Sequence, residues 1–288
     1  MQTLEAQAVR SGWRVAGRVL ALERPLVMGI VNVTPDSFSD GGRFFDRSAA
    51  LEHALRLIDD GADLLDIGGE STRPGAADVP ARDEIERVVP LFEALAGRGI
   101  PLSVDTSKPE VMRSALAAGA AIVNDVRALR EAGAIEAIAD SDCGIVLMHM
   151  QGTPRTMQGA PEYRDVTQEV TDFLAQRIGT LVAHGADVRR IVVDPGFGFG
   201  KTAAHNFTLL RELERLAELG RPVLVGLSRK SMLGAVTDRK VDEREFASVA
   251  AVVLAVERGA RIVRVHDVAA TRDALAVLQA MQSTGGRT

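Results

Sequence analysis

Eight polar or glycine-rich clusters recur along this 288-residue chain, and the acids, amides and bases in them could bind a charged, planar molecule. In order, the clusters read "NVTPDSFSDGG" (32–42), "GGESTRPG" (68–75), "DTSKPE" (105–110), "ND" (124–125), "MHMQGTP" (148–154), "DPGFGFGKT" (194–202), "GLSRKS" (226–231) and "RVHD" (264–267). Each follows a short apolar run, where a buried strand would end. One such cluster alone is more often a helix cap or a turn, but eight are more than a fold needs.

Three positions in these clusters, Asp105, Asn124 and Asp194, combine two carboxylates with an amide. A carboxylate accepts paired hydrogen bonds from a flat amidine-like edge, in the geometry that pairs it with arginine. Lys230 and Arg264 add cationic donors, and a guanidinium also stacks on planar rings. The set favours a flat, nitrogen-rich heterocycle as the ligand over a sugar or a fatty chain.

A second group of polar residues suits phosphate oxygens or a hard cation; its members are Asn32, Ser71, Thr72, Arg73 and His266. Asn32 is the one obvious neutral oxygen ligand, so a Mg²⁺ ion there would take most of its ligands from phosphates and water. The five histidines and the single cysteine lack the spacing of a zinc site. The absence of a G-x-S-x-G motif argues against a serine hydrolase.

The stretch "DPGFGFGKT" ends like a phosphate-binding P-loop, G-x-x-x-x-G-K-[ST]. Gly200, Lys201 and Thr202 fit the end of that pattern, but Pro195 occupies the position of its first glycine. We therefore expect no P-loop here. Its glycines would let the backbone pass close to a flat ring, which makes Asp194 and Phe199 the better candidates and leaves the role of Lys201 open.

Short apolar runs alternate with longer amphipathic ones. We expect strands near 26–31, 63–67, 101–104, 121–123, 144–148, 190–193, 222–225 and 261–265. Helices are expected between and after them, for example over 48–60, 84–97, 109–118, 165–184, 206–219 and 244–258. The strands are almost wholly apolar, which is typical of a parallel sheet buried on both faces.

An internal repeat supports this alternation: "GADLLDIG" (61–68), "GAAIVND" (119–125), "GADVRRIVVD" (185–194) and "GARIVRVHD" (259–267) each run from Gly-Ala through an apolar strand to an aspartate. The glycine suits a left-handed helix C-cap. Eight strand–helix units predict an α/β fold, a (β/α)₈ TIM barrel, with an open doubly wound sheet as the alternative. We expect a short hairpin at 13–22 below the barrel and one domain over 1–288, with a barrel core of about 24–282.

Composition excludes several classes of function. The formal net charge of −5 argues against a general nucleic-acid binder. No apolar run is long enough to span a membrane, and the first ten residues do not form a signal peptide. The single cysteine, Cys143, rules out a disulfide within the chain and favours a reducing compartment, so we expect a cytoplasmic protein.

In its order of motifs the chain closely resembles the dihydropteroate synthases. The resemblance covers about residues 26–268 and rests on "MGIVNVTPDSFSDGG", "DIGGESTRPGA", "SVDTSKPEV", "NDV", "MHMQGTP", "DPGFGFGK", "GLSRKS" and "RVHDV". It implies a TIM-barrel enzyme that condenses 6-hydroxymethyl-7,8-dihydropterin diphosphate with 4-aminobenzoate, releasing diphosphate and 7,8-dihydropteroate. It also implies assistance by Mg²⁺, a homodimer, and competition by sulfonamides for the 4-aminobenzoate site.

Site residues follow by motif position, and the resemblance assigns catalysis to Asp105, Asp194, Lys230 and Arg264. The pterin diphosphate site would comprise Thr72, Asp105, Asn124, Met148, Asp194, Phe199, Lys230, Arg264, Val265 and His266. The 4-aminobenzoate pocket would comprise Phe38, Arg73, Pro74, Lys230 and Ser231, and the metal ligand would be Asn32. Arg127, where a small residue is expected, departs from the pattern.

Two other functions remain open at this point. A folate-dependent methyltransferase would share the pterin-binding barrel, but it is expected to lack the "TPDSFSDGG" and "STRPG" loops that are present here. An inactive pterin-binding paralogue would be expected to carry degraded loops, and these loops are intact.

Overall fold

A closed parallel barrel is the centre of the structure. A computed structural model describes residues 12–34, 42–72, 75–153, 156–157, 159 and 161–284. Around the barrel the strand order is β10-β3-β4-β5-β6-β7-β8-β9. The strands are β3 (Leu26–Asn32), β4 (Leu64–Gly68), β5 (Leu102–Asp105), β6 (Ile122–Asp125), β7 (Gly144–Met148), β8 (Ile191–Asp194), β9 (Val223–Val225) and β10 (Ala260–Val265). Closure of the sheet confirms the predicted (β/α)₈ barrel and rules out the open sheet.

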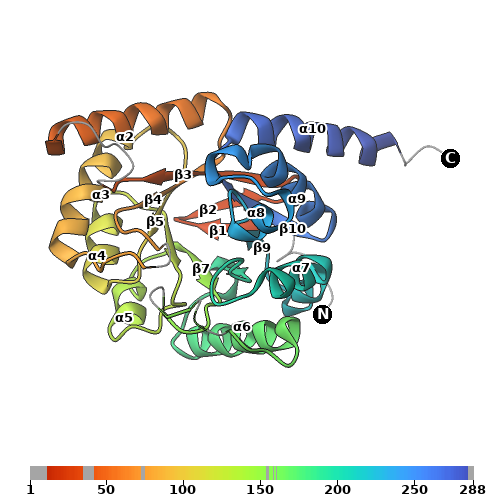
Figure 1. Cartoon of the computed structure of the whole chain (residues 1–288). Helices are drawn as coiled ribbons and strands as arrows, with labels where there is room; N and C mark the ends of the chain where they lie inside the picture. The colour runs from red at the N-terminus through yellow and green to blue at the C-terminus, as the bar shows by residue number, and fades with distance from the viewer. Residues whose placement is uncertain are drawn as a thin grey trace.

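Helices surround the barrel (Figure 1). They are α2 (Gly42–Asp59), α3 (Ala81–Leu95), α4 (Pro109–Ala117), α5 (Ala134–Ile138), α6 (Val166–Ala183), α7 (Ala203–Arg211), α8 (Ser231–Thr237), α9 (Glu245–Glu257) and α10 (Val268–Thr284). Short 3-10 helices are η2 (Val188–Arg190), η3 (Leu213–Leu219) and η4 (Val241–Glu243). The helix expected over 206–219 is in fact two: α7 begins earlier, where Thr202 caps it, and ends before Glu212, after which η3 buries Leu213 and Leu216 at 3-10 spacing.

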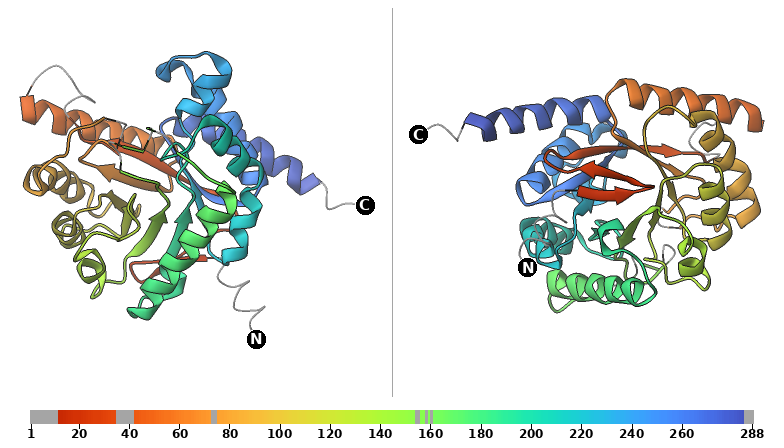
Figure 2. Two further views of the ribbon diagram at one scale, coloured as in Figure 1. Left: turned by 60° about the horizontal axis from the view of Figure 1, so that its bottom comes forward. Right: turned by 180° about the vertical axis from the view of Figure 1, so that it is seen from behind.

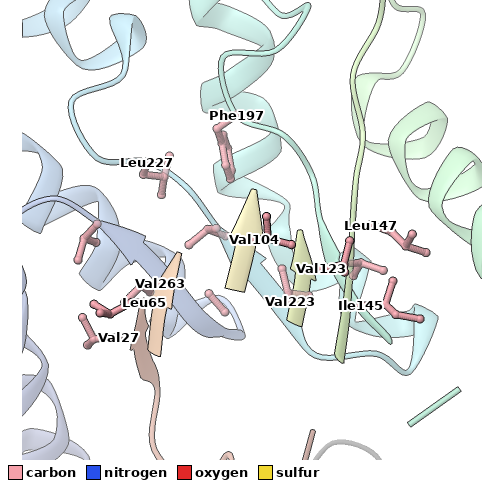
Figure 3. Packing of buried hydrophobic residues seen from close by; sticks show 14 of the residues in the cluster. Val27, Leu65, Val104, Val123, Ile145, Leu147, Phe197, Val223, Leu227 and Val263 are labelled. Carbon is pink, nitrogen blue, oxygen red and sulfur yellow. The ribbon is translucent and has the colours of Figure 1, made fainter. Parts of the chain in front are cut away.

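Alternate strand residues face two separate hydrophobic clusters. Val27, Leu65 and Val263 belong to the outer cluster (Figure 3), in which they pack with helix residues such as Phe92. Residues such as Met28 face the barrel interior instead. The full inner set from the strands is Leu26, Met28, Leu64, Ile122, Val146, Val192, Leu224 and Ile262. Burial on both faces explains why the strands are apolar at almost every position.

The glycines of the internal repeat have the predicted backbone conformation. Gly61, Gly119, Gly185 and Gly259 have φ between 88° and 104°, in the left-handed region. Gly61, Gly119 and Gly259 lie within three residues of the next barrel strand, and Gly185 precedes the 3-10 helix η2 that leads into β8. A side chain at such a position would strain the backbone, so the repeat marks four places where a helix must stop and the chain must reverse.

The predicted hairpin is present and seals one end of the barrel. Strand β1 (Gly12–Val15) pairs with β2 (Arg18–Ala21), and the view from behind in Figure 2 shows this red pair lying across the barrel end. Trp13 is fully buried in the inner cluster, and its Nε1 donates a hydrogen bond to the Arg190 carbonyl at 2.8 Å. A Cβ at Gly144 would lie only 2.8 Å from the Trp13 ring, so the first residue of β7 must be small.

In the described residues, no helix is both long enough and apolar enough to cross a lipid bilayer.

The buried position of Trp13 yields a stability prediction. We expect Trp13→Ala to lower the free energy of unfolding by about 3–5 kcal/mol, because it removes the largest side chain of the inner cluster and leaves a cavity. Urea denaturation followed by circular dichroism measures the change. A loss below about 1 kcal/mol would show that the hairpin does not support the barrel.

Candidate active site

The polar strand ends predicted from the sequence meet at one mouth of the barrel. Parallel pairing sets Gly68 opposite Asp105 and Asp105 opposite Asn124, while Met148 lies opposite Asp194. On the other side of β4, Asn32 pairs with Gly68. These residues therefore form a ring at the C-terminal ends of the strands, which is where barrel enzymes carry their active sites.

Arg264 on β10 joins two carboxylates inside this ring. Its Nη2 lies 2.7 Å from Asp105 Oδ2 and its Nε lies 2.5 Å from Asp66 Oδ2. The amide of Asn124 donates to the same Asp66 oxygen at 3.0 Å. Arg264 thus holds together β4, β5 and β10, and the two carboxylates raise its pKa above the ordinary value.

Asp66 was not among the predicted site residues, although it carries much of this cluster. It lies in the middle of β4, is fully buried, and faces Ser103 on the neighbouring strand. The sequence did carry a signal for Asp66: it is a lone acid between apolar residues in "LLDIG". An acid almost never lies in a buried strand unless it is paired.

Burial shifts the titration of the two ring carboxyls toward neutral pH. Desolvation raises the pKa of Asp105 to about 7, opposed by Arg264 and reinforced by Asp66. Desolvation also raises the pKa of Asp194 to about 6, opposed by the Gly196 N–H and then by Lys230. Such shifts are more frequent at functional sites than elsewhere in a protein.

Some buried oxygens in the cluster have no hydrogen-bond partner within the described part of the chain. They are Oδ1 of Asp105, Oδ1 of Asp66 and Oγ of Ser103. Buried polar atoms are normally paired, so each unpaired acceptor calls for an explanation. A ligand with several N–H groups, entering from the mouth, would supply donors to the Asp105 oxygen.

Lys230 approaches the ring from the loop after β9. Its Nζ lies 4.2 Å from the centroid of the Phe199 ring, a cation–π distance. A Cβ at Gly198 would be 3.1 Å from the Lys230 stem, so the glycine-rich turn leaves room for it. Burial and the nearby Arg264 lower the pKa of Lys230 to about 8, against the attraction of Asp194.

Lys201 serves the turn that carries Asp194 and Phe199. Its buried Nζ lies 2.9 Å from His149 Nδ1, 2.9 Å from the Gly196 carbonyl and 3.1 Å from the Phe199 carbonyl. Burial lowers the pKa of His149 to about 2, so its imidazole is neutral and accepts this hydrogen bond. Burial lowers the pKa of Lys201 to about 7, and its Nζ is surrounded by acceptors of its own loop and of His149, so the Lys-Thr ending is a structural clamp rather than a phosphate site.

The glycines of the same turn lie against the segment after β7. A Cβ on Gly196 would be 1.9 Å from the His149 carbonyl, and one on Gly200 would be 2.5 Å from the Gln151 carbonyl. This close approach brings Phe199 to a small cluster with Met148. The two side chains predicted to flank a ring therefore do lie together at the mouth.

Asp125 organises the turn after β6. Its carboxylate accepts the backbone N–H groups of Arg127 at 2.8 Å and Leu129 at 2.7 Å. The Arg127 side chain forms an ion pair with Glu131 in the turn between β6 and α5, so the unexpected arginine is accommodated outside the ring of strand ends.

The remaining predicted residues lie around the mouth with different exposures. Asn32, Thr72 and His266 are half-buried, and Ser231 is exposed at the start of α8. His266 Nδ1 lies 2.9 Å from Ser228 Oγ. The side chain of Val265 belongs to the outer hydrophobic cluster, so only its backbone faces the site region. Phe38, Arg73 and Pro74 lie outside the described residues.

Residues 28–266 match the family described as pterin binding enzymes. A dihydropteroate synthase of Neisseria meningitidis serogroup C is 50% identical over 277 residues, covering 94% of this chain and 98% of the relative. The Escherichia coli (strain K12) dihydropteroate synthase is 48% identical over 268 residues, covering 93% and 95%. The chain belongs to the dihydropteroate synthase family of pterin-binding enzymes.

Solved structures of the family share both fold and length with this chain. Xanthomonas albilineans dihydropteroate synthase with 4-aminobenzoic acid has a TM-score of 0.89 and 57% identity, covering 94% of this chain and 98% of the other. The same enzyme with 7,8-dihydropteroate has a TM-score of 0.86 and 55% identity, with the same coverage. A Yersinia pestis dihydropteroate synthase with a sulfonamide drug complex has a TM-score of 0.90 and 48% identity, covering 94% and 99%.

The raised pKa of Asp194 predicts that its ionised carboxylate lowers the free energy of unfolding. The folded chain binds the proton of Asp194 more tightly than the unfolded chain does. The contribution of Asp194 to the free energy of unfolding therefore decreases as the pH rises from about 3.8 to about 6. We expect Asp194→Asn to increase the free energy of unfolding by about 1–3 kcal/mol at alkaline pH, with a smaller gain in acid. Urea denaturation at both pH values measures it. An equal loss of stability at both would contradict the assignment.

Proposed function

We propose that this dihydropteroate synthase family member condenses 6-hydroxymethyl-7,8-dihydropterin diphosphate with 4-aminobenzoate, and that the ring of polar strand ends holds the pterin. The observation that carries the proposal is the buried set of Asp105, Asn124 and Asp194 beside Lys230 and Arg264. These acceptors and donors lie within a chain about half identical to synthases of the same length.

The pterin ring offers the N–H donors that the carboxylates of Asp105 and Asp194 can accept. Its amino-pyrimidinone edge carries adjacent N–H donors, which a carboxylate accepts in pairs. We assign this edge to Asp105, Asn124 and Asp194, and we assign ring acceptors to the Lys230 ammonium. Met148 and Phe199 supply apolar contact with the ring faces. Arg264 stays in its ion pair with Asp66 and Asp105 and so presents a fixed positive charge.

Charge explains the chemistry. Diphosphate leaves as an anion, and we assign its stabilisation to Arg264, His266, Thr72 and the backbone near Val265. Its departure is the breaking of the bond between the pterin methylene and the diphosphate oxygen; the bonding electron pair goes to that oxygen and leaves positive charge on the methylene and pterin. Asp105 and Asp194 offset that charge. The amine of 4-aminobenzoate forms the new C–N bond with its own lone pair and then releases one N–H proton to water, while the enzyme contributes mainly by holding the two substrates together.

The second substrate is assigned to the opening of the site. We place 4-aminobenzoate beside Lys230 and the exposed Ser231, with Phe38, Arg73 and Pro74 completing the pocket. Sulfonamides are proposed to compete there. Lys230 would then contact both substrates, which fits its place between the turn at Phe199 and the start of α8.

Mg²⁺ is proposed as the cofactor, with Asn32 as its protein ligand. The described residues contain no group of three or more acidic, histidine or cysteine side chains able to hold a metal. The half-buried Asn32 amide at the end of β3 is a neutral oxygen donor, which suits an ion that keeps water and takes phosphate oxygens as its other ligands. When bound, the ion would neutralise diphosphate charge.

We also propose a cytoplasmic homodimer in which each chain is one barrel domain with a core of about 24–282. The single cysteine, Cys143, is buried and forms no disulfide, which fits a reducing compartment. On the surface, Phe246 is 85% exposed on α9 and Val277 is 72% exposed on α10. Helices α9 and α10 pack together and α10 runs out past the barrel, so these apolar side chains suit a shared interface (Figure 1).

The purified 288-residue chain tests the proposed reaction. With the pterin diphosphate, 4-aminobenzoate and Mg²⁺ it should form 7,8-dihydropteroate and release diphosphate in equal amounts. Failure to form dihydropteroate, with the protein folded by circular dichroism, would refute the synthase function.

Asn32→Ala tests the metal assignment. We expect the Mg²⁺ concentration for half-maximal activity to rise about tenfold, because the ion loses its protein ligand. Calorimetry with 6-hydroxymethylpterin, which has no diphosphate, should give the same Kd for the variant and the wild type. Unchanged Mg²⁺ dependence would remove Asn32 from the site.

Phe246→Glu tests the interface. A buried, unpaired carboxylate would oppose association, so we expect the variant to behave as a monomer in light scattering while the wild type is a dimer. Val19→Glu, at an apolar residue 70% exposed on the hairpin strand β2, is the matched control and should leave the dimer intact. A dimeric Phe246→Glu protein would exclude this face.

A further inference from the structure

Arg229 lies just before Lys230 and adopts a backbone conformation that side chains disfavour. Its φ is 59°, in the left-handed region. For an L-residue other than glycine this conformation costs free energy and persists only where the surroundings hold it. Such residues cluster at functional sites, so we asked what holds Arg229 and what its conformation directs.

The backbone N–H and carbonyl of Arg229 form hydrogen bonds with side chains at helix α9: one on the helix and one on Arg244, the residue before it. Its N–H donates to Ser248 Oγ at 2.9 Å, and its carbonyl accepts from Arg244 Nη1 at 3.1 Å. The buried Ser248 hydroxyl donates in turn to the Arg244 carbonyl at 2.6 Å. The left-handed conformation is therefore held from both sides by hydrogen bonds.

The Arg229 side chain reaches in another direction, to the chain after β10. Its Nη2 lies 2.5 Å from Asp267 Oδ1 and its Nε 3.3 Å from Asp267 Oδ2, a two-pronged ion pair. Next to it, Ser228 Oγ accepts the backbone N–H of His266 at 3.2 Å. Two consecutive residues after β9 are thus tied to two consecutive residues after β10.

These ties link the two loops that carry the cations of the site. The loop after β9 continues into Lys230 and Ser231, while the chain before Asp267 carries Arg264 and His266. We propose that Arg229 is a positioning residue: its strained backbone and its pair with Asp267 set Lys230 and Ser231 relative to Arg264. The inference rests on the function proposed above. Relaxation of φ at Arg229 would redirect the chain at the next residue and move Lys230 away from Phe199.

Three variants distinguish the contribution of the left-handed backbone conformation from that of the ion pair with Asp267. Arg229→Ala removes the pair and disfavours the left-handed conformation, whereas Arg229→Gly removes the pair but tolerates that conformation. Asp267→Asn weakens the pair and retains a residue type that caps helices well, next to the start of α10. All three are measured for kcat, for KM of each substrate, and for the calorimetric Kd of the pterin diphosphate.

We expect kcat/KM for 4-aminobenzoate to fall at least about tenfold in Arg229→Ala, because small displacements of a positioned group are costly to catalysis. In Arg229→Gly and Asp267→Asn, kcat/KM for 4-aminobenzoate should fall by smaller factors. The Kd of the pterin diphosphate should rise in all three variants. The double variant Arg229→Gly/Asp267→Asn should be no worse than Arg229→Gly alone, because both changes remove one interaction.

Arg24→Ala is the matched control. Arg24 forms a similar two-pronged pair with Asp63, at 2.7 and 3.0 Å, just before β3 and β4 at the opposite end of the barrel. It should lose stability without a change in KM or Kd.

Wild-type kinetics within about twofold in folded Arg229→Gly and Asp267→Asn would overturn the inference, and these two variants decide if Arg229→Ala does not fold. If the wild-type chain makes no dihydropteroate, the proposed function fails. The Kd values for the pterin diphosphate then still decide the role of Arg229.

Discussion

The ion pairs between Arg264 and the buried carboxylates of Asp66 and Asp105 are the interaction on which the mouth of the barrel depends. Removing three charges from water is expensive, and their mutual attraction offsets that cost only when the geometry is good. Here the guanidinium spans from β10 to Asp66 in the middle of β4 and to Asp105 at the end of β5, so one side chain joins three strands. Loss of Arg264 would leave two uncompensated carboxylates in the barrel interior.

The hydrophobic layers make this arrangement possible. Below the polar ring, the inner cluster closed by Trp13 keeps water out of the barrel, and outside it the helices cover the strands. Burial away from water strengthens each charge interaction in the ring, and this desolvation raises the pKa values of Asp105 and Asp194 to about 7 and about 6. A ligand that brings N–H donors and develops positive charge would stabilise the ionised carboxylates, which is the demand of pterin methylene transfer.

Much of this could be predicted from the sequence, because it depends on local patterns. Glycines at the four repeat positions predict where helices end, and continuous apolar runs predict a parallel sheet that is buried on both faces. The polar cluster after each strand then indicates a shared mouth once the barrel closes. The Phe199 and Met148 pair follows from the same reasoning, since each ends or follows a neighbouring strand.

Other features depend on contacts between distant residues and could not be predicted in this way. The pairing of Asp66 with Arg264 joins residues 198 positions apart, and nothing local shows that Lys201 turns back onto its own loop instead of facing a ligand. The break between α7 and η3 follows from the way Leu213 and Leu216 are buried. The strained Arg229 is hidden in the sequence because its conformation is imposed by Ser248, Arg244 and Asp267 rather than by its own type.

The most direct test of the central claim is a crystal structure of the chain with bound 7,8-dihydropteroate. The account predicts the pterin edge within hydrogen-bond distance of Asp105, Asn124 and Asp194, the Lys230 ammonium on a ring acceptor, and Arg264 still joined to Asp66. A pterin bound away from these carboxylates, or an Arg264 that leaves Asp66 and Asp105, would contradict it.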